Sequence, residues 1–124
     1  MGNSDYGESA VAGGSMLARR QWASRLYRDR GFMRALAARW REVRRQGLAG
    51  HLQRRVRAHA GALSASGAAG RNFRRWPVLG QRVWPNPASA VSRTTYGSEV
   101  AALRSWLRVR VAWLDRNVAR LRGG

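Results

Sequence analysis

The chain has 124 residues, the size of one domain, and 44% of them are hydrophobic, which allows a modest core. It carries 24 basic and 6 acidic residues, for a net charge of +18, and it has no cysteine, which excludes disulfides and thiolate metal sites. This charge predicts salt-dependent attraction to polyanions, either nucleic acid, an acidic membrane or an acidic protein.

The basic residues are all arginine, which suits bidentate phosphate recognition but would also follow from codon bias. No uncharged run approaches the roughly 18 residues that a membrane span needs. The first residues are acidic or glycine-rich and lack the pattern of a signal peptide. The sequence therefore indicates a chain without a transmembrane segment or an export signal, and it assigns no compartment.

Residues 1–15 are rich in glycine and have little periodicity, so they are expected to form an irregular lead-in to one helical domain over residues 16–124. Loose apolar spacing predicts a first helix from Met16 to Arg28. Asp29 is placed as the N-cap of a second helix, whose apolar stripe runs from Phe32 to Val43 and which Gly47 should end.

A third helical pattern starts at Leu48 and continues toward Phe73, although internal glycines weaken it; the alternative is that its Gly, Ala and Ser positions allow close approach of another helix. Trp76 precedes Pro77 and should stop any helix there, since a residue before proline is disfavoured in the α region. A polar connection over residues 88–95 leads to the last helix, which has Ser98 and Glu99 in its first turn. The apolar stripe of that helix is the most regular in the chain: Val100, Leu103, Leu107, Val111, Leu114, Val118 and Leu121.

No run of residues alternates like a strand, so the predicted fold is all-α, with about four helices and an irregular connector rich in Trp and Pro. The connector reads RNFRRWPVLGQRVWPNP from Arg71 to Pro87 and contains all three prolines. Its aromatic and aliphatic side chains are expected to pack against neighbouring helices as a clamp, although an ordinary loop is the alternative. The predicted clamp residues are Phe73, Trp76, Pro77, Trp84, Pro85, Trp106 and Trp113, and Val78, Leu79 and Val83 should be buried with them.

The search for reactive groups selects no catalytic, cofactor-binding or metal-binding residue. A phosphate loop of the Walker type needs lysine, and the chain has none. His51 and His59 are expected to be exposed helix residues. Asp5 and Glu8 could approach a metal or a substrate, but no second acidic pair accompanies them.

Arginines next to aromatic residues provide the remaining candidates. Arg110 lies four residues after Trp106 and three before Trp113, so stacking of its guanidinium on an indole is sterically reasonable; a packed arginine stem is the alternative. Three arginines flank Phe73 and could form an anion-binding face for a polyanion, as in proteins that bind single-stranded nucleic acid. They are Arg71, Arg74 and Arg75. The alternative is that Phe73 belongs to the core and that these arginines are solvated.

Two stretches resemble the C-terminal part of the spore-coat CotH kinase-like family. They are the connector and the run YGSEVAALRSWLRVRVAWLD from Tyr96 to Asp115. GNSDYG from Gly2, WASRLYRD from Trp22, and the F-x-x-x-L and RW-R-x-x-R pattern from Phe32 to Arg44 are similar to the same family in the same order, so that the resemblance covers nearly the whole chain.

The resemblance implies the helical end of the large lobe of an atypical protein kinase. Its ATP-binding and divalent-metal residues, including a Trp-Asp-Phe-Asp type of run, would lie before the position of Gly2, so no cofactor is expected in this chain. The resemblance thus predicts a truncated, non-catalytic helical segment whose partner is the missing kinase-like portion or an acidic protein. The alternatives are a small Arg-rich helical protein that binds nucleic acid or another polyanion, and a translated fragment without a function of its own.

Overall fold

The computed structural model describes residues 21–84 and 86–120, and for residues 21–23 only the backbone. Within these ranges the chain is helical and contains no strand, which confirms the all-α prediction. The elements are α3 (Gln21–Arg28), α4 (Arg30–Arg45), α5 (Leu48–Ala65), α6 (Ala68–Arg75), η1 (Ala88–Ser92), α7 (Tyr96–Asn117) and η2 (Val118–Arg120), where η marks a 3₁₀ helix.

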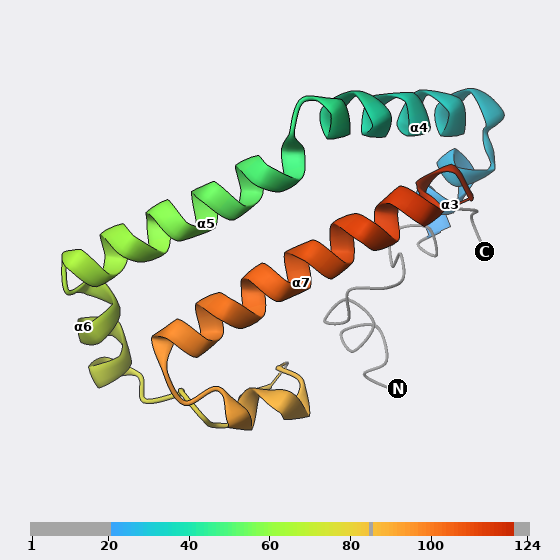
Figure 1. Cartoon of the computed structure of the whole chain (residues 1–124). Helices are drawn as coiled ribbons and strands as arrows, with labels where there is room; N and C mark the ends of the chain where they lie inside the picture. The colour runs from blue at the N-terminus through green and yellow to red at the C-terminus, as the bar shows by residue number, and fades with distance from the viewer. Residues whose placement is uncertain (1–20, 85, 121–124) are drawn as a thin grey trace.

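The two longest helices, α5 and α7, lie side by side and run in opposite directions (Figure 1). At one end of this hairpin, α6 and the connector turn the chain from α5 into α7. At the other end, α4 meets α3 and the η2 turn that follows α7. The α5–α7 hairpin is therefore the frame to which the other elements attach.

Capping residues set the boundaries of the helices much as the sequence predicts. Asp29 is the N-cap of α4, and its carboxylate accepts a 2.6 Å hydrogen bond from the backbone N–H of Phe32. Gly47 separates α4 from α5 at a φ of 83°, in the left-handed region that favours glycine. The predicted third helix is divided, because Gly67 adopts a φ of 69° between α5 and α6. This break raises the number of described α-helices from the expected four or so to five.

The first five residues of the predicted connector, residues 71–75, belong to α6, so the irregular part begins later than expected; the helix stops at the predicted residue. Trp76 leaves the helical region at φ −128° and ψ 87°, immediately before Pro77. The stretch predicted as a polar connection contains η1, whose Ala90 is only 2% exposed. Thr95 then caps α7, and Thr95 and Ser98 form a capping box in which each side chain accepts a hydrogen bond from the other's backbone N–H.

The core is small. Among the described residues, four hydrophobic side chains are buried: Ala37, Ala90, Val111 and Val118. Two of them belong to the predicted stripe of the last helix, but Leu103 on the same stripe is 47% exposed. The remaining large apolar side chains are only partly covered, because one pair of long helices cannot surround them.

The predicted clamp is wrong for its central residues. Trp76 is 59% exposed and Trp84 is 64% exposed, and Val78 and Val83 are exposed as well. The connector instead attaches through its backbone, since the N–H of Gly80 donates a 2.8 Å hydrogen bond to the carbonyl of Arg93, and the η1 helix that follows it buries Ala90. α6 turns the chain at the tip of the hairpin, and the connector that follows it lies at this end of the hairpin (Figure 1).

The other clamp residues have different surroundings. Pro77 is exposed, and Phe73, Leu79, Trp106 and Trp113 are half-buried. Pro85 and the whole of the predicted lead-in, residues 1–15, lie outside the described residues.

Candidate functional surfaces

Asp115, near the end of α7, joins this helix to α4. Its Oδ1 accepts hydrogen bonds from Nε1 of Trp40 at 3.0 Å and from Nε of Arg44 at 2.8 Å. Its Oδ2 accepts a further bond from Nη2 of Arg44 at 3.0 Å, which makes the arginine contact bidentate. Trp40 and Arg44 are four residues apart, so one face of α4 presents both donors to a single carboxylate.

The electrostatics of this joint follow from the arginine. The hydrogen bonds from Arg44 lower the pKa of Asp115 below its ordinary value of 3.8, and burial opposes the shift. The side chains of Arg44 and Asp115 are 31% and 37% exposed, so water screens the pair in part. Asp115 is thus an ionised structural residue at neutral pH.

A second set of contacts fixes the start of α7. Arg93 donates from Nε to Glu99 Oε2 at 2.8 Å across the N-terminal turn of the helix. The ring of Tyr96 packs against Phe73 of α6, with 6.0 Å between the centroids. These contacts tie the connector and α6 to the hairpin and cover one side of Phe73.

Midway along the hairpin, Gln53 of α5 and Arg104 of α7 bond reciprocally. The Gln53 amide donates to the Arg104 carbonyl at 2.9 Å and accepts from Arg104 Nε, also at 2.9 Å. This polar link fixes the register of the two helices, between which few apolar side chains are buried. Periodicity does not reveal it, because both residues look like ordinary solvated positions in the sequence.

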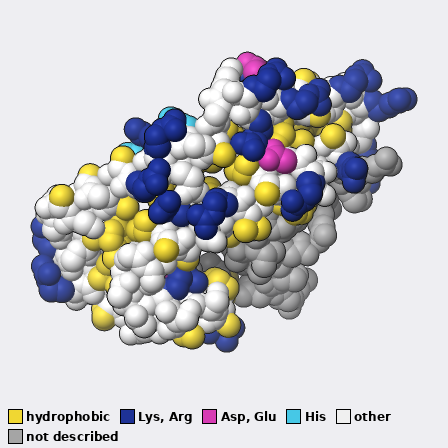
Figure 2. Space-filling model, viewed as in Figure 1, with side chains coloured by type: hydrophobic (Ala, Val, Ile, Leu, Met, Phe, Trp, Pro, Cys, Tyr) yellow, Lys and Arg dark blue, Asp and Glu magenta, His cyan; other side chains and the backbone are white. Residues whose placement is uncertain are grey.

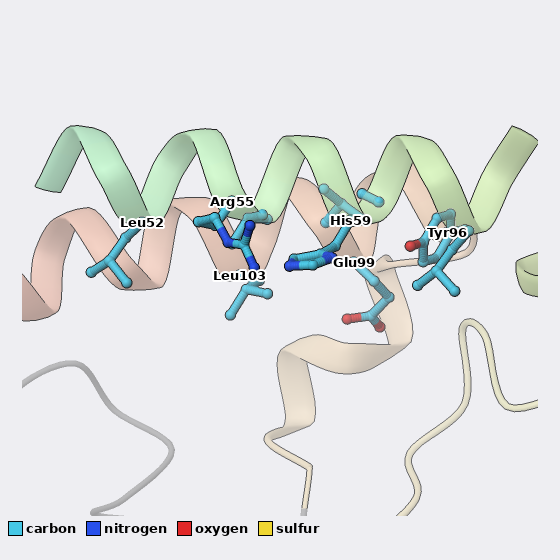
Figure 3. Close-up of a pocket in the computed structure, with 10 residues that line it drawn as sticks. Leu52, Arg55, His59, Tyr96, Glu99 and Leu103 are labelled. Carbon is cyan, nitrogen blue, oxygen red and sulfur yellow. The ribbon is translucent and has the colours of Figure 1, made fainter. Parts of the chain in front are cut away.

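An apolar groove of about 510 Å³ lies along the α5–α7 hairpin. Its walls are mostly aliphatic, and residues from both helices point into it (Figure 3). Arg55 and His59 of α5 stand on one wall and are exposed, whereas Glu99 of α7 faces them but is already bonded to Arg93. The lining residues are Leu52, Arg55, Val56, His59, Ala60, Leu63, Tyr96, Glu99, Val100 and Leu103.

Small residues explain why the groove stays open. Ala60 of α5 lies in the lining and offers only a methyl group to fill the space beside α7. Leu63 and Leu103, on opposite helices, are each 47% exposed at this surface. The groove was not predicted from the sequence, in which the small residues of this stretch indicated either a weakened helix or close approach of a neighbouring helix.

The three arginines predicted as an anion-binding face lie on α6 and are all exposed. Arg71 donates from Nη1 to the carbonyl of Ser66 at 3.0 Å, which orients it along the start of α6. Arg75 lies over the indole of Trp76, 5.4 Å from the ring centroid. Phe73 is turned toward Tyr96, so the exposed aromatic group next to these arginines is Trp76.

Arginine dominates the visible charge, and acidic side chains are few (Figure 2). Each of the four described carboxylates serves the fold: Asp29 caps α4, and Glu42, Glu99 and Asp115 bond to Arg39, Arg93 and Arg44. The hydrogen bond from Arg39 lowers the pKa of Glu42.

Other sequence predictions have clear outcomes. The guanidinium of Arg110 lies 4.8 Å from the ring centroid of Trp113, which confirms the predicted stacking. His51 and His59 are exposed on α5, also as predicted. Asp5 and Glu8 lie outside the described residues.

Two broader features can be stated for residues 21–84 and 86–120. No three His, Asp or Glu side chains in these ranges gather as they would around a metal ion. No described helix has the length and apolarity needed to cross a bilayer.

Comparison of the chain with protein-family models, with curated proteins and with solved structures finds no match.

Proposed function

We propose that this chain is a non-catalytic helical segment of the CotH kinase-like type, which supports a larger kinase-like protein by packing against it. The proposal rests on the resemblance of the sequence to this family and on one structural observation. Residues of the stretches that carry the resemblance contact one another and connect the helices. Trp40 and Arg44 of the RW-R-x-x-R pattern bond to Asp115, the last residue of the Tyr96–Asp115 run. Phe73 of the connector packs on Tyr96, the first residue of that run.

These contacts support a structural role because they engage carboxylates that phosphoryl transfer would need. Transfer of a phosphoryl group relies on a carboxylate positioned as a base and on carboxylates that hold magnesium. The four described carboxylates are engaged in a helix cap and in arginine pairs instead. The exposed indoles of Trp76 and Trp84 supply apolar surface of the kind that a packing partner covers.

Phosphotransfer tests this proposal. The purified full chain is incubated with ATP, with magnesium or manganese, and with an acidic acceptor protein, and the incorporation of labelled phosphate is measured. We expect no incorporation above that of an Asp115→Asn variant, which keeps a similar shape but weakens the α4–α7 joint. Robust transfer by the unaltered chain would overturn the non-catalytic assignment.

A second candidate function is the binding of a polyanion such as single-stranded nucleic acid. It is favoured by the exposed Arg71, Arg74 and Arg75 on α6 and by the exposed indole of Trp76 that follows them. The discriminating measurement is the affinity for a labelled single-stranded oligonucleotide as a function of salt. Tight binding near physiological ionic strength that is lost on substitution of these arginines supports this function. Weak binding that disappears on adding salt reduces it to nonspecific attraction by a chain of net charge +18.

A further inference from the structure

We propose that the groove between α5 and α7 binds a short amphipathic helix of another polypeptide, with the apolar face of that helix in the groove and its carboxylates toward Arg55 and His59. The proposal rests on the groove alone and does not depend on the kinase-like assignment. It commits to an acidic, helical protein segment as the occupant.

The dimensions of the groove suit such a segment. Along α5 the lining runs from Leu52 to Leu63, eleven residues apart, which corresponds to about 16 Å at 1.5 Å per residue. An occupant helix of about three turns would match this length and place apolar residues at i, i+3 or i+4, and i+7 in the groove. The half-exposed Leu63 and Leu103 would each lose water contact on binding, and this supplies the apolar driving force.

The charged residues of the groove lining indicate which type of helix would bind there. Arg55 and His59 stand exposed on the α5 wall, and Arg55 forms no ion pair with any carboxylate in the described part of the chain. Glu99, the acidic residue of the lining, is held by Arg93 at 2.8 Å. A positive wall beside an apolar floor complements an amphipathic segment with glutamates or aspartates along one flank.

Other occupants fit less well. A second copy of this chain would bring a further net charge of +18 against the same surface, so repulsion opposes a dimer here. Nucleic acid would place phosphates against aliphatic walls, at the cost of their hydration. A flat bilayer cannot fill a recess between two helices. A separate acidic helix satisfies both the shape and the charge.

The test uses the full chain and a fluorescently labelled synthetic peptide of about 18 residues, with leucines on one helical face and glutamates beside them. Binding is followed by fluorescence anisotropy near physiological salt. A peptide of the same composition in scrambled order and a peptide with lysine in place of glutamate serve as probe controls. Sedimentation of the chain alone reports whether it dimerises.

Substitutions on the two walls give the expected pattern. Leu103→Glu should abolish binding, and it should not disturb folding, because Leu103 is 47% exposed. Arg55→Glu should weaken the binding of the glutamate peptide about fivefold or more and should strengthen the binding of the lysine peptide. Arg57→Glu is the matched control: the same change on α5, also exposed but outside the lining, should alter affinity less than twofold.

Several results would overturn the proposal. Equal weakening by Arg55→Glu and Arg57→Glu would show attraction by net charge only. Equal binding of the scrambled peptide, or unchanged binding by a folded Leu103→Glu variant, would show that the groove is not used. Dimerisation of the chain that Leu103→Glu abolishes would assign the groove to a second copy instead.

Discussion

Removal of the Asp115 carboxylate should weaken the fold by an amount set by its three hydrogen bonds. Hydrogen bonds to a charged group contribute about 1.5–3 kcal/mol when buried, whereas an exposed ion pair contributes about 0.2–1 kcal/mol. With the Arg44 and Asp115 side chains 31% and 37% exposed, the contact lies between these cases. Asp115→Ala is therefore expected to lower the free energy of unfolding by about 1.5 kcal/mol. The measurement is urea denaturation followed by circular dichroism.

A double-mutant cycle separates this joint from other effects of the substitution. Arg44→Ala, Asp115→Ala and the double variant should give a coupling energy of about 1 kcal/mol. Glu42→Gln is the control, since Glu42 pairs with Arg39 on the exposed surface of α4 and should change stability little. A coupling energy of zero between Arg44 and Asp115 would refute the claim that their contact holds α4 to α7.

The same joint should give a defined dependence on pH. The pKa of Asp115 is lower in the folded chain than its ordinary 3.8, so the folded state favours the ionised carboxylate. The stabilisation is then fully present above pH about 4 and is lost as the pH falls through the lowered pKa. The difference in stability between the unaltered chain and Asp115→Ala should accordingly shrink in acid. A difference that stays constant down to pH 2 would contradict the assignment.

Further predictions concern backbone, caps and surface indoles, each measured by urea denaturation. Gly67→Ala should destabilise by about 1 kcal/mol, because Gly67 has a φ of 69° and an added Cβ would also lie 3.1 Å from Arg71 Nη1. Gly61→Ala should stabilise by about 0.5–1 kcal/mol, since Gly61 lies inside α5 with nothing within 4 Å of an added Cβ; destabilisation there would contradict the open surface. Thr95→Ala should cost about 1 kcal/mol through loss of the α7 cap, and Thr95→Ser should restore most of it. Trp76→Ser and Trp84→Ser should leave stability within about 0.5 kcal/mol, whereas a large loss from either would reinstate the clamp.

Local rules in the sequence predicted much of the secondary structure. The N-cap at Asp29, the stop at Trp76 before Pro77, and the first turn of α7 at Ser98 and Glu99 all follow from side chains that act within a few residues. The division at Gly67 was missed because a glycine in a helical pattern either weakens the helix or turns the chain. Periodicity does not distinguish these two outcomes.

The contacts between helices were less accessible from the sequence. Asp115 bonds to residues 71 and 75 positions earlier, and no spacing rule connects them. The clamp prediction failed for a related reason: it inferred burial from the apolar character of Trp76 and Trp84. Whether an indole is buried depends on the surfaces that the fold brings to it, and Trp76 and Trp84 remain 59% and 64% exposed.

The central claim is that the bonds of Trp40 and Arg44 to Asp115 join α4 to α7 in a helical frame, and that Trp76 and Trp84 of the connector lie on its outside. Native-state hydrogen exchange tests it most directly, because protection is measured at each backbone amide. The account predicts that amides around Val111 in α7 and Ala37 in α4, which are buried positions of these two helices, exchange slowest. Amides from Val78 to Val83 should exchange faster than these, apart from the amide of Gly80, which donates to the carbonyl of Arg93. Equal or slower exchange in the connector than around Val111 would contradict the account.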